Sequence, residues 1–242
     1  MQQPLMVNRH IHFKEVTSTN DVALDLAQQG AEHLTCVTAD VQTKGRGRRG
    51  RVWTTIPNKS VAASFLVRQL SHHLLPFAIS LAVAETCEHW VGDVQIKWPN
   101  DILIKGHKAS GVLIERHSGG DQTPFYIVGI GINVNKYTAD ELATSYPTTS
   151  LEDHANAAIS MGDVVNLLAQ RVAYWVATSH DDVLDHYKKS CITLGKKVEW
   201  KMEDKSLLGQ AISMDESGAL ILKLEDGAEQ KVLSGDIIIQ NG

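Results

Sequence analysis

The chain has 242 residues, of which 43% are hydrophobic, and a formal net charge of −5. This length and apolar content predict a folded protein with one large and one small domain, and the negative charge excludes a global positive field that attracts nucleic acid. Three widely spaced cysteines without a C-x-x-C pair favour a cytoplasmic location over a disulfide framework or a zinc ribbon. We expect neither secretion nor a membrane span, because there is no signal-like N-terminus and no run of ~18 apolar residues.

Apart from its last fifty residues, the chain is predicted to fold as a mixed sheet with helices. Apolar and β-branched runs predict strands over residues 13–16, 36–39, 61–67, 94–97, 102–104, 112–115 and 125–132. Amphipathic spacing predicts helices over 22–27, 74–90 and 164–176, the first after several candidate N-caps at 18–21 and the last after a capping box formed by Ser160 and Asp163. A hairpin connection is expected at Lys105-Gly106-His107-Lys108.

After Cys191 the pattern changes to short alternating strands, such as 197–201 and 219–224, separated by turns at 215–218 and 225–227. This pattern of short strands and turns predicts a small β-barrel. We therefore expect an α+β fold with two units, residues 1–190 and 191–242.

The most conspicuous feature is a basic, glycine-rich loop between two predicted strands. Five cations and three glycines share eight positions, namely Lys44, Gly45, Arg46, Gly47, Arg48, Arg49, Gly50 and Arg51. Arginine binds carboxylate or phosphate through charge-assisted, often bidentate hydrogen bonds, and glycine lets the backbone approach a ligand and change shape. The composition favours anion binding, with a solvated basic turn as the alternative.

The same glycines match two nucleotide-binding patterns whose context is absent. G-x-G-x-x-G must open a helix, whereas residues 51–57 end at a proline and predict none. A P-loop needs Lys and Ser/Thr after its last glycine, and Arg51 and Val52 stand there. A small RNA- or DNA-binding patch is a third alternative, which the negative net charge and the lack of interleaved aromatic residues disfavour.

Three further segments carry polar groups at predicted strand ends. In Lys97-Trp98-Pro99-Asn100-Asp101 the proline enforces a break that can turn side chains into a cleft, where Asp101 could hold Mg²⁺ or accept a proton. The other two segments are Lys108-Ala109-Ser110-Gly111 and Gly129-Ile130-Gly131-Ile132-Asn133. For each segment the structural alternative stays open, namely turn hydrogen bonds, a solvated lysine or ordinary strand packing.

Taken in order, these segments closely resemble the catalytic domain of biotin–protein ligases over about residues 13–135. The matching positions are Ser18-Thr19-Asn20, Gln42, Gly45 to Gly50, Trp53, Lys97 to Asp101, Lys108-x-x-Gly111 and Gly129-x-Gly131-x-Asn133. The C-terminal unit resembles the small SH3-like domain of that family. The resemblance implies the mixed sheet of the biotin/lipoate ligases, and it begins too early in the chain to leave room for the DNA-binding domain that some members carry.

Such enzymes convert biotin and ATP to biotinyl-5′-AMP and pyrophosphate, and then transfer biotin to a lysine of a biotin carboxyl carrier protein. The resemblance implies biotin and ATP as substrates, Mg²⁺ with unassigned ligands, and no DNA or membrane partner, and it leaves a homodimer open. An enzyme that handles lipoate or an octanoyl group is the enzymatic alternative, although the Gly/Arg loop followed by Lys-Trp-Pro-Asn-Asp favours biotin.

The resemblance also implies site roles. Catalytic roles fall to Arg46, Lys108 and Asp101, because cations offset the repulsion between a carboxylate and a phosphate. Biotin-binding roles fall to Ser18, Thr19, Asn20, Gln42, Gly45, Arg46, Arg48, Trp53, Lys108, Gly111 and Gly129. Nucleotide-binding roles fall to Arg48, Lys97, Asn100, Gly131 and Asn133. The loop from Gly45 to Gly50 is expected to close over the intermediate as a lid and exclude water.

Overall fold

The computed structural model describes residues 9–68, 70, 73–118, 124–138, 141, 146–202 and 206–240. Its helices are α1 (Thr19–Gln28), α2 (Leu75–Glu88), α3 (Met161–Ala177) and α4 (His180–Ser190), with a short 3₁₀ turn η1 (Arg48–Gly50). The first seven strands are β1 (Arg9–Val16), β2 (Thr35–Gln42), β3 (Ser60–Val67), β4 (Val94–Lys97), β5 (Asp101–Ile104), β6 (His107–His117) and β7 (Phe125–Asn133). The last five are β8 (Lys197–Lys201), β9 (Ser206–Met214), β10 (Leu220–Leu224), β11 (Glu229–Val232) and β12 (Asp236–Ile239).

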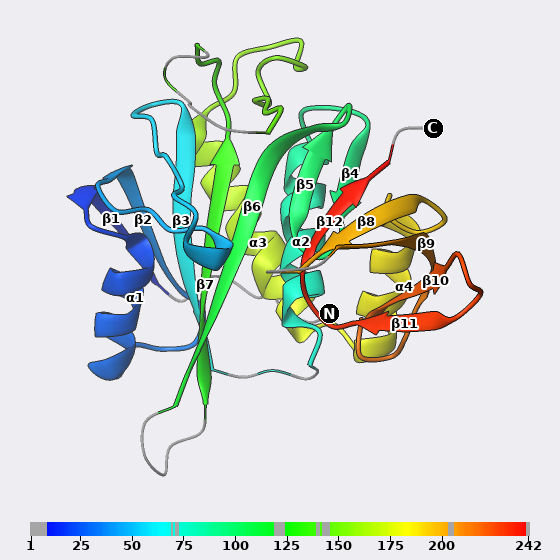
Figure 1. Cartoon of the computed structure of the whole chain (residues 1–242). Coiled ribbons are helices and arrows are strands. Elements are labelled where there is room, and N and C mark those ends of the chain that lie inside the picture. Colours follow the sequence, from blue (N-terminus) through cyan, green and yellow to red (C-terminus); the bar gives the residue numbers. More distant parts are fainter. Residues whose placement is uncertain are drawn as a thin grey trace.

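Strands β1 to β7 form one mixed sheet in the order β1-β2-β3-β7-β6-β5-β4 (Figure 1). Strands β1 and β2 run parallel, and the other neighbouring pairs run antiparallel. Successive side chains of a strand point to opposite faces, so each strand divides its residues between two environments. On β3, Phe65 belongs to a large apolar core, whereas Leu66 belongs to a separate small cluster on the other face.

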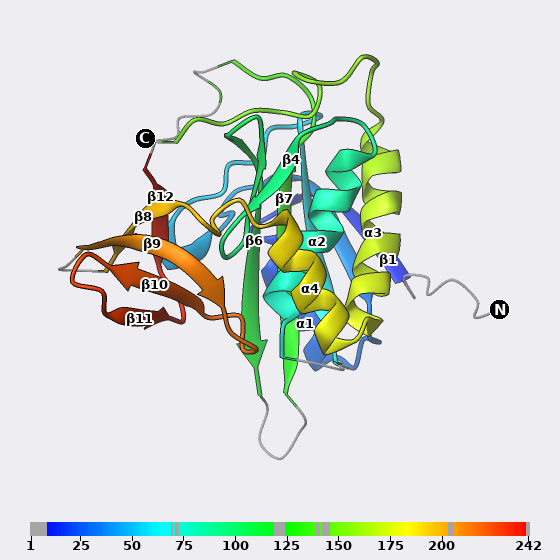
Figure 2. The ribbon, with the colours of Figure 1, turned by 90° about the vertical axis from the view of Figure 1, so that its right-hand side faces the viewer.

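The large core lies between the sheet and helices α2, α3 and α4. Figure 2 shows α2 and α3 on one side of the sheet and the small C-terminal sheet projecting from the other. Helix α1 packs on the face opposite α2, where Ala23 and Ala27 contact the cluster of Val37, Leu66 and Ile127. Its main strand contacts are to β2, β3 and β7. The same face over β6, β5 and β4 therefore remains available for a site.

Strands β8 to β12 form a five-stranded antiparallel sheet in the order β11-β10-β9-β8-β12. The apolar core continues from α2 into this sheet, because Leu220, Leu222 and Val232 belong to the same cluster as the helices. The junction is tight at Gly218, where φ is +80° and a Cβ would overlap the Phe77 ring of α2. The C-terminal unit is thus packed directly onto the larger one.

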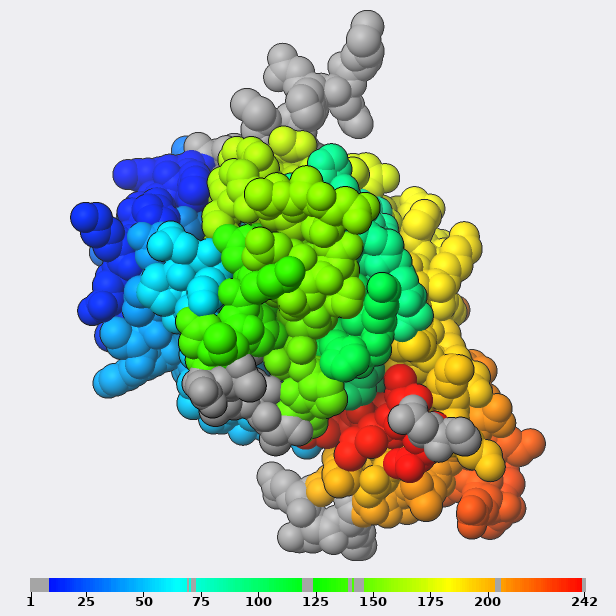
Figure 3. Space-filling model, turned by 90° about the horizontal axis from the view of Figure 1, so that it is seen from above, coloured from blue at the N-terminus to red at the C-terminus, as the bar shows by residue number. Residues whose placement is uncertain are grey.

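Residues 146–160, which precede α3, cross one end of the large sheet. In Figure 3 they lie, green to yellow-green, between the N-terminal strands in blue and cyan and β12 in red. Backbone hydrogen bonds tie them to the sheet, from Leu151 to Asn133 and from Thr149 to Lys108. This crossing closes the end of the sheet at which the glycine-rich part of β7 finishes.

The predicted α+β fold with a mixed sheet and a small C-terminal β unit is confirmed. Strand β4 has the predicted bounds, whereas β1 and β6 extend further because their polar residues hide the apolar signal. The predicted hairpin connection at residues 105–108 is confirmed, but it is shorter than expected: Lys105 and Gly106 alone join β5 to β6, with φ of +49° and +80°, as a two-residue hairpin turn requires. Helix α4 was not predicted, since its apolar stripe is short.

No helix in the described ranges is long and apolar enough to cross a membrane.

Candidate active site

A cavity of about 530 Å³ opens on the sheet face that α1 leaves uncovered. Its walls come from the N-terminus of α1, the Gly/Arg loop, the segment 97–101, residues 146–148 and β12. Among the residues that the structure describes, six cationic residues and two carboxylates line it: Arg46, Arg48, Arg51, Lys97, Lys108 and Lys201, with Asp101 and Asp236. A chain of net charge −5 thus gathers positive charge in one concave site, which indicates an anionic ligand.

Glycines keep the floor of the cavity flat. The strand register places Lys97, Asp101, Gly111 and Gly131 in one row across β4, β5, β6 and β7. The Trp53 indole lies over Gly131, where a Cβ would overlap the ring. Its Nε1 is buried and has no hydrogen-bond partner among the described residues. The row therefore begins with the charged side chains of Lys97 and Asp101 and continues onto glycines that the Trp53 ring covers.

The Gly/Arg loop is folded as a narrow hairpin beside the cavity. Trp53 N–H donates to Gly45 O at 3.0 Å, and Gly47 N–H donates to Arg51 O at 2.7 Å. Gly45 is buried at the base of this hairpin, where a side chain would collide with the Trp53 carbonyl group. Backbone packing in the loop therefore explains why this position is a glycine.

The first two arginines of the loop have different partners. Arg46 forms a bidentate pair with Asp21, with Nη–Oδ distances of 3.0 and 2.7 Å, and its Nη2 lies 3.3 Å from Glu115 Oε1. Arg48 donates to Asn100 Oδ1 at 2.6 Å, and burial lowers the pKa of its guanidinium. An anion beside Arg48 would compensate for the hydration lost on burial. Arg48 is therefore oriented toward a ligand more directly than Arg46, whose charge is paired with carboxylates.

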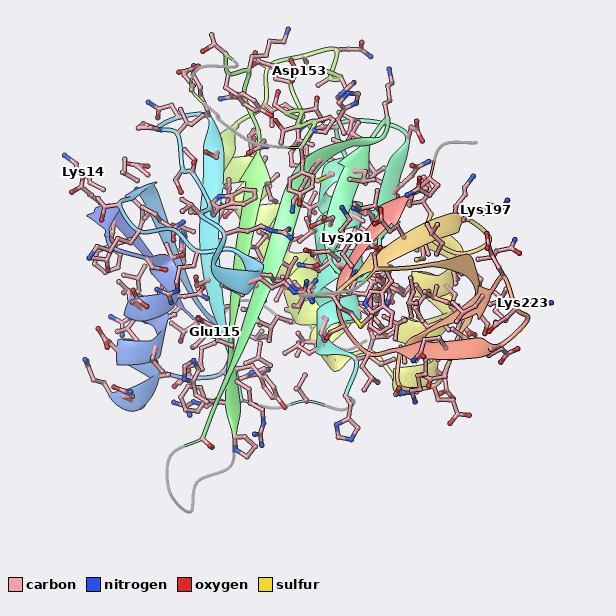
Figure 4. The ribbon with its side chains drawn as sticks, viewed as in Figure 1. Lys14, Glu115, Asp153, Lys197, Lys201 and Lys223 are labelled. Atoms are coloured by element: carbon pink, nitrogen blue, oxygen red, sulfur yellow. The ribbon has the colours of Figure 1, made fainter. Side chains whose placement is uncertain are left out.

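The small sheet closes the cavity along β12. Asp236 accepts hydrogen bonds from Arg51 and, at 3.4 Å, from Arg49. Lys201 also lines the cavity, from the end of β8 nearest the large sheet (Figure 4). Arg51 in addition lies over the Tyr146 ring, 5.4 Å from its centroid. The C-terminal unit therefore contributes charged groups to the site and holds the loop.

Lys108 and Asp101 form the charged end of the floor. Lys108 Nζ lies 2.5 Å from Asp101 Oδ1, and 26% and 24% of the two side chains are exposed. Burial lowers the pKa of the neighbouring Lys97 ammonium, and Asp101 offsets part of that effect. Asn100 donates Nδ2–H to Val112 O at 2.5 Å, which orients its carbonyl oxygen toward Arg48. Three cations around one carboxylate leave this end positive.

The segment that carries these groups is anchored through its two central residues. Trp98, which is 2% exposed, donates its backbone N–H to Thr193 Oγ1 at 3.0 Å and its indole N–H to Gly218 O at 3.1 Å. Tyr187 of α4 donates its hydroxyl to Pro99 O at 3.0 Å. The tryptophan and the proline thus fix the backbone, and the polar residues on either side face the cavity.

A buried polar cluster lies at the opposite end, beside the N-terminus of α1. Thr19 N–H donates to Gln42 Oε1 at 2.8 Å, and Thr19 Oγ1 lies 2.7 Å from Ser64 Oγ. Asn20 accepts from Ser64 Oγ at 2.6 Å through Oδ1 and donates Nδ2–H to Glu115 Oε2 at 2.6 Å. Hydroxyl and amide groups of this kind recognise a neutral ligand that carries both donors and acceptors.

All of the predicted site residues except Gly45 line the cavity within the described part of the chain: Ser18, Thr19, Asn20, Gln42, Arg46, Arg48, Trp53, Lys97, Asn100, Asp101, Lys108, Gly111, Gly129, Gly131 and Asn133. The structure shows where they lie, and their individual roles remain predictions. Sequence reasoning missed Asp21, Ser64, Glu115, Tyr146 and Asp236. Asp21 and Glu115 stand beside predicted features, whereas nothing local marks Ser64 or Asp236 as a site residue.

Comparison with known proteins agrees with this geometry. Residues 12–135 match the Biotin/lipoate A/B protein ligase family, and residues 193–239 match the Biotin protein ligase C terminal domain. The chain belongs to the biotin/lipoate A/B protein ligase family. The similarity to biotin–protein ligases that the sequence motifs indicate is thereby confirmed at the level of the family.

Relatives and solved structures in this family match along most of the chain. The bifunctional ligase/repressor BirA of Bacillus subtilis strain 168 is 31% identical over 250 residues, covering 96% of this chain and 74% of the relative. The biotin–[acetyl-CoA-carboxylase] ligase of Paracoccus denitrificans is 30% identical over 221 residues, covering 85% and 90%. The structure of the Aquifex aeolicus biotin protein ligase in complex with biotin and ATP superposes with a TM-score of 0.79 at 28% identity, covering 97% and 100% of the two chains.

Proposed function

We propose that this member of the family is a biotin–protein ligase that converts biotin and ATP to biotinyl-5′-AMP and pyrophosphate, and then transfers biotin to a lysine of a biotin carboxyl carrier protein. The observation that carries the proposal is the order of chemistry along the cavity. Biotin has a ureido ring with donors and acceptors, an apolar chain and a terminal carboxylate. The cavity presents a polar cluster, an apolar floor under Trp53 and a cationic end in the same order. Its volume of about 530 Å³ is typical of small-molecule sites.

In the first step the biotin carboxylate attacks the α-phosphorus of ATP and pyrophosphate leaves. Two anions must approach each other, so preorganised cations are the main catalytic requirement. We assign Lys108 and Arg48 to the reacting carboxylate and phosphate, and Arg46 to closing the loop over them. Lys97 and Asn100 lie beside Arg48 and Asp101 and complete a phosphate-binding end.

The remaining polar residues divide between the nucleotide and the second step. Asn133 and Gly131 end the glycine-rich strand at the closed end of the sheet, where we place the nucleoside. The Tyr146 ring, 46% exposed and lining the cavity, is suited to stacking on a base. Asp101 is the carboxylate nearest the reacting end, and we assign it to accept a proton from the acceptor lysine.

The residues present fit a Mg²⁺ ion that arrives with the nucleotide. Mg²⁺ is usually bound by one or two carboxylates together with substrate phosphates, and Asp101 supplies such a carboxylate. The described ranges hold no group of three or more His, Cys, Asp or Glu residues that could bind a metal on its own. Asp101 would hold the ion jointly with ATP, and its charge would offset that of the phosphates.

The Gly/Arg loop is suited to act as a lid. Arg46 holds it to Asp21, and Arg51 holds it to Asp236. Because about 40% of each arginine side chain is exposed (40% and 41%), such ion pairs are individually weak. The loop can therefore release to admit substrates and close again to exclude water from the mixed anhydride.

We also propose that the chain divides into a catalytic unit, residues 1–190, and a C-terminal unit, residues 191–242. The boundary follows α4 and precedes β8, where the sheet changes. The shared apolar core and the contact between Asp236 and the loop support a role for the C-terminal unit in completing the cavity.

The experiment that tests the function measures biotin-dependent exchange of pyrophosphate into ATP, followed by transfer of labelled biotin to a biotin carboxyl carrier domain. Lipoate is assayed in parallel, because the family includes lipoate ligases by name. We expect exchange and transfer with biotin. Turnover with lipoate alone would replace the proposal with the alternative substrate, and absence of turnover with both would reject it.

A further inference from the structure

The buried polar cluster contains a chain of four oxygen atoms that is one hydrogen atom short. The atoms are Asn20 Oδ1, Ser64 Oγ, Thr19 Oγ1 and Gln42 Oε1, joined by contacts of 2.6, 2.7 and 3.0 Å. Contacts of this length lie in the range of O–H···O hydrogen bonds, and each needs a hydrogen atom between its two oxygens to be satisfied. The two hydroxyl groups supply one hydrogen each, and the two amide oxygens supply none. Three contacts therefore share two hydrogen atoms.

Both ends of the chain are held as acceptors by partners outside it. Gln42 Oε1 accepts the backbone N–H of Thr19 at 2.8 Å, so the oxygen of that amide must face inward. At the other end Glu115 Oε2 accepts Asn20 Nδ2–H at 2.6 Å, which turns the Asn20 oxygen toward Ser64. Arg46 Nη2 lies 3.3 Å from Glu115 Oε1, and its positive charge complements the carboxylate.

The oxygen left without a donor follows from these constraints. Ser64 donates to Asn20, so the Thr19 hydroxyl hydrogen can serve either Gln42 or Ser64. With either partner, Thr19 Oγ1 itself accepts no hydrogen bond within the chain. Thr19 and Gln42 both line the cavity, whereas Ser64 is fully buried behind them. The unfilled acceptor, Thr19 Oγ1, therefore faces the ligand.

We propose that Glu115 is a positioning residue that sets the hydrogen-bond polarity of this end of the cavity. By holding Asn20 with its oxygen inward, Glu115 keeps the chain short of one donor, and a ligand N–H supplies it. The inference rests on the proposed function, in which that donor is a ureido N–H of biotin. Glu115 itself, on β6 (Figure 4), is outside the cavity lining and acts through Asn20.

The proposal predicts that replacing one carboxylate oxygen of Glu115 with an amide nitrogen weakens biotin binding. In Glu115→Gln the new amide can donate to Asn20 Oδ1, so the Asn20 amide can turn and donate to Ser64. Ser64 then donates to Thr19 and Thr19 to Gln42, which fills all three contacts without a ligand. We expect biotin to bind Glu115→Gln about tenfold more weakly than wild type, equivalent to about 1.4 kcal/mol. Glu115→Ala permits the same rotation and should behave alike, whereas Glu115→Asp keeps a carboxylate and should restore most of the affinity.

The test is isothermal titration of the full chain without nucleotide. The probes are biotin and its two cyclic carbamate analogues, in each of which an oxygen replaces one ureido N–H. Wild type should prefer biotin by about tenfold over the carbamate that lacks the donor facing Thr19, and Glu115→Gln should bind the two within about threefold of each other. Glu229→Gln on the distant strand β11 is the matched control and should bind like wild type. Thermal unfolding of each variant verifies that it is folded.

The outcomes separate the inference from the function. Equal biotin affinity of wild type and Glu115→Gln would overturn the inference, and so would an equal loss of affinity for biotin and both carbamates, because that pattern indicates a purely structural role. If Glu115→Gln does not fold, the same comparison of Glu115→Asp with Glu115→Ala decides the matter. Absence of biotin binding by wild type would instead refute the proposed function, and the inference with it.

Discussion

Replacement of Lys108 by methionine removes the positive charge at the reacting end of the cavity while keeping most of the apolar stem. The ammonium lies 2.5 Å from Asp101 Oδ1, with about three-quarters of both side chains covered (26% and 24% exposed). Loss of a hydrogen bond to a charged group costs ~1.5–3 kcal/mol. In the reaction the same ammonium would stabilise charge that develops on the phosphate, and removing one such preorganised donor typically costs ~10²–10³ in rate.

The assay is biotin-dependent exchange of pyrophosphate into ATP. We expect Lys108→Met to reduce kcat/KM by about two to three orders of magnitude and Lys108→Ala to abolish measurable exchange. Contacts to the ureido ring should persist, because the polar cluster lies at the other end of the cavity, so the loss should appear mainly in kcat. Lys14→Met, at the exposed far edge of the sheet (Figure 4), is the matched control. Exchange at the wild-type rate in Lys108→Met would refute the assignment.

Three further changes test other parts of the site. Arg46→Gly should release biotinyl-5′-AMP faster, since the loop loses a bidentate anchor, and unchanged dissociation of the intermediate would contradict a lid. Burial lowers the pKa of Lys97 from its ordinary value of 10.5, so as the pH rises the free enzyme loses this positive charge before pH 10.5 is reached. ATP affinity should therefore fall as the pH rises toward 10.5. Lys97→Arg, which stays protonated, should flatten this pH profile of ATP affinity. Gly131→Ala places a methyl group in the Trp53 ring. It should destabilise the protein by about 1–3 kcal/mol and change the tryptophan fluorescence. Gly92→Ala is the control: no atom lies within 4 Å of its new methyl group, so stability and fluorescence should stay unchanged.

The sequence by itself determined the family, the fold class and most of the cavity lining. Strand and helix periodicity is local, so β4 and β7 are found within one residue of their predicted bounds. The spacing of Lys97, Lys108 and Gly131 along the chain marks the site because each stands at a strand end or a glycine-rich position. Charge clustering in the Gly/Arg loop likewise needs no tertiary information to indicate an anion.

Tertiary structure alone decided which groups meet. The chain of buried hydrogen bonds joins Asn20 to Ser64, 44 residues away, and to Glu115, 95 residues away. Asp236 reaches Arg51 across 185 residues. Such contacts depend on strand order and register, which place β3, β7 and β6 side by side under the N-terminus of α1, and no local pattern encodes that order. The hydrogen-bond pattern of the buried polar cluster is therefore a property of the folded sheet, whereas the resemblance to the family is already present in the linear order of the motifs.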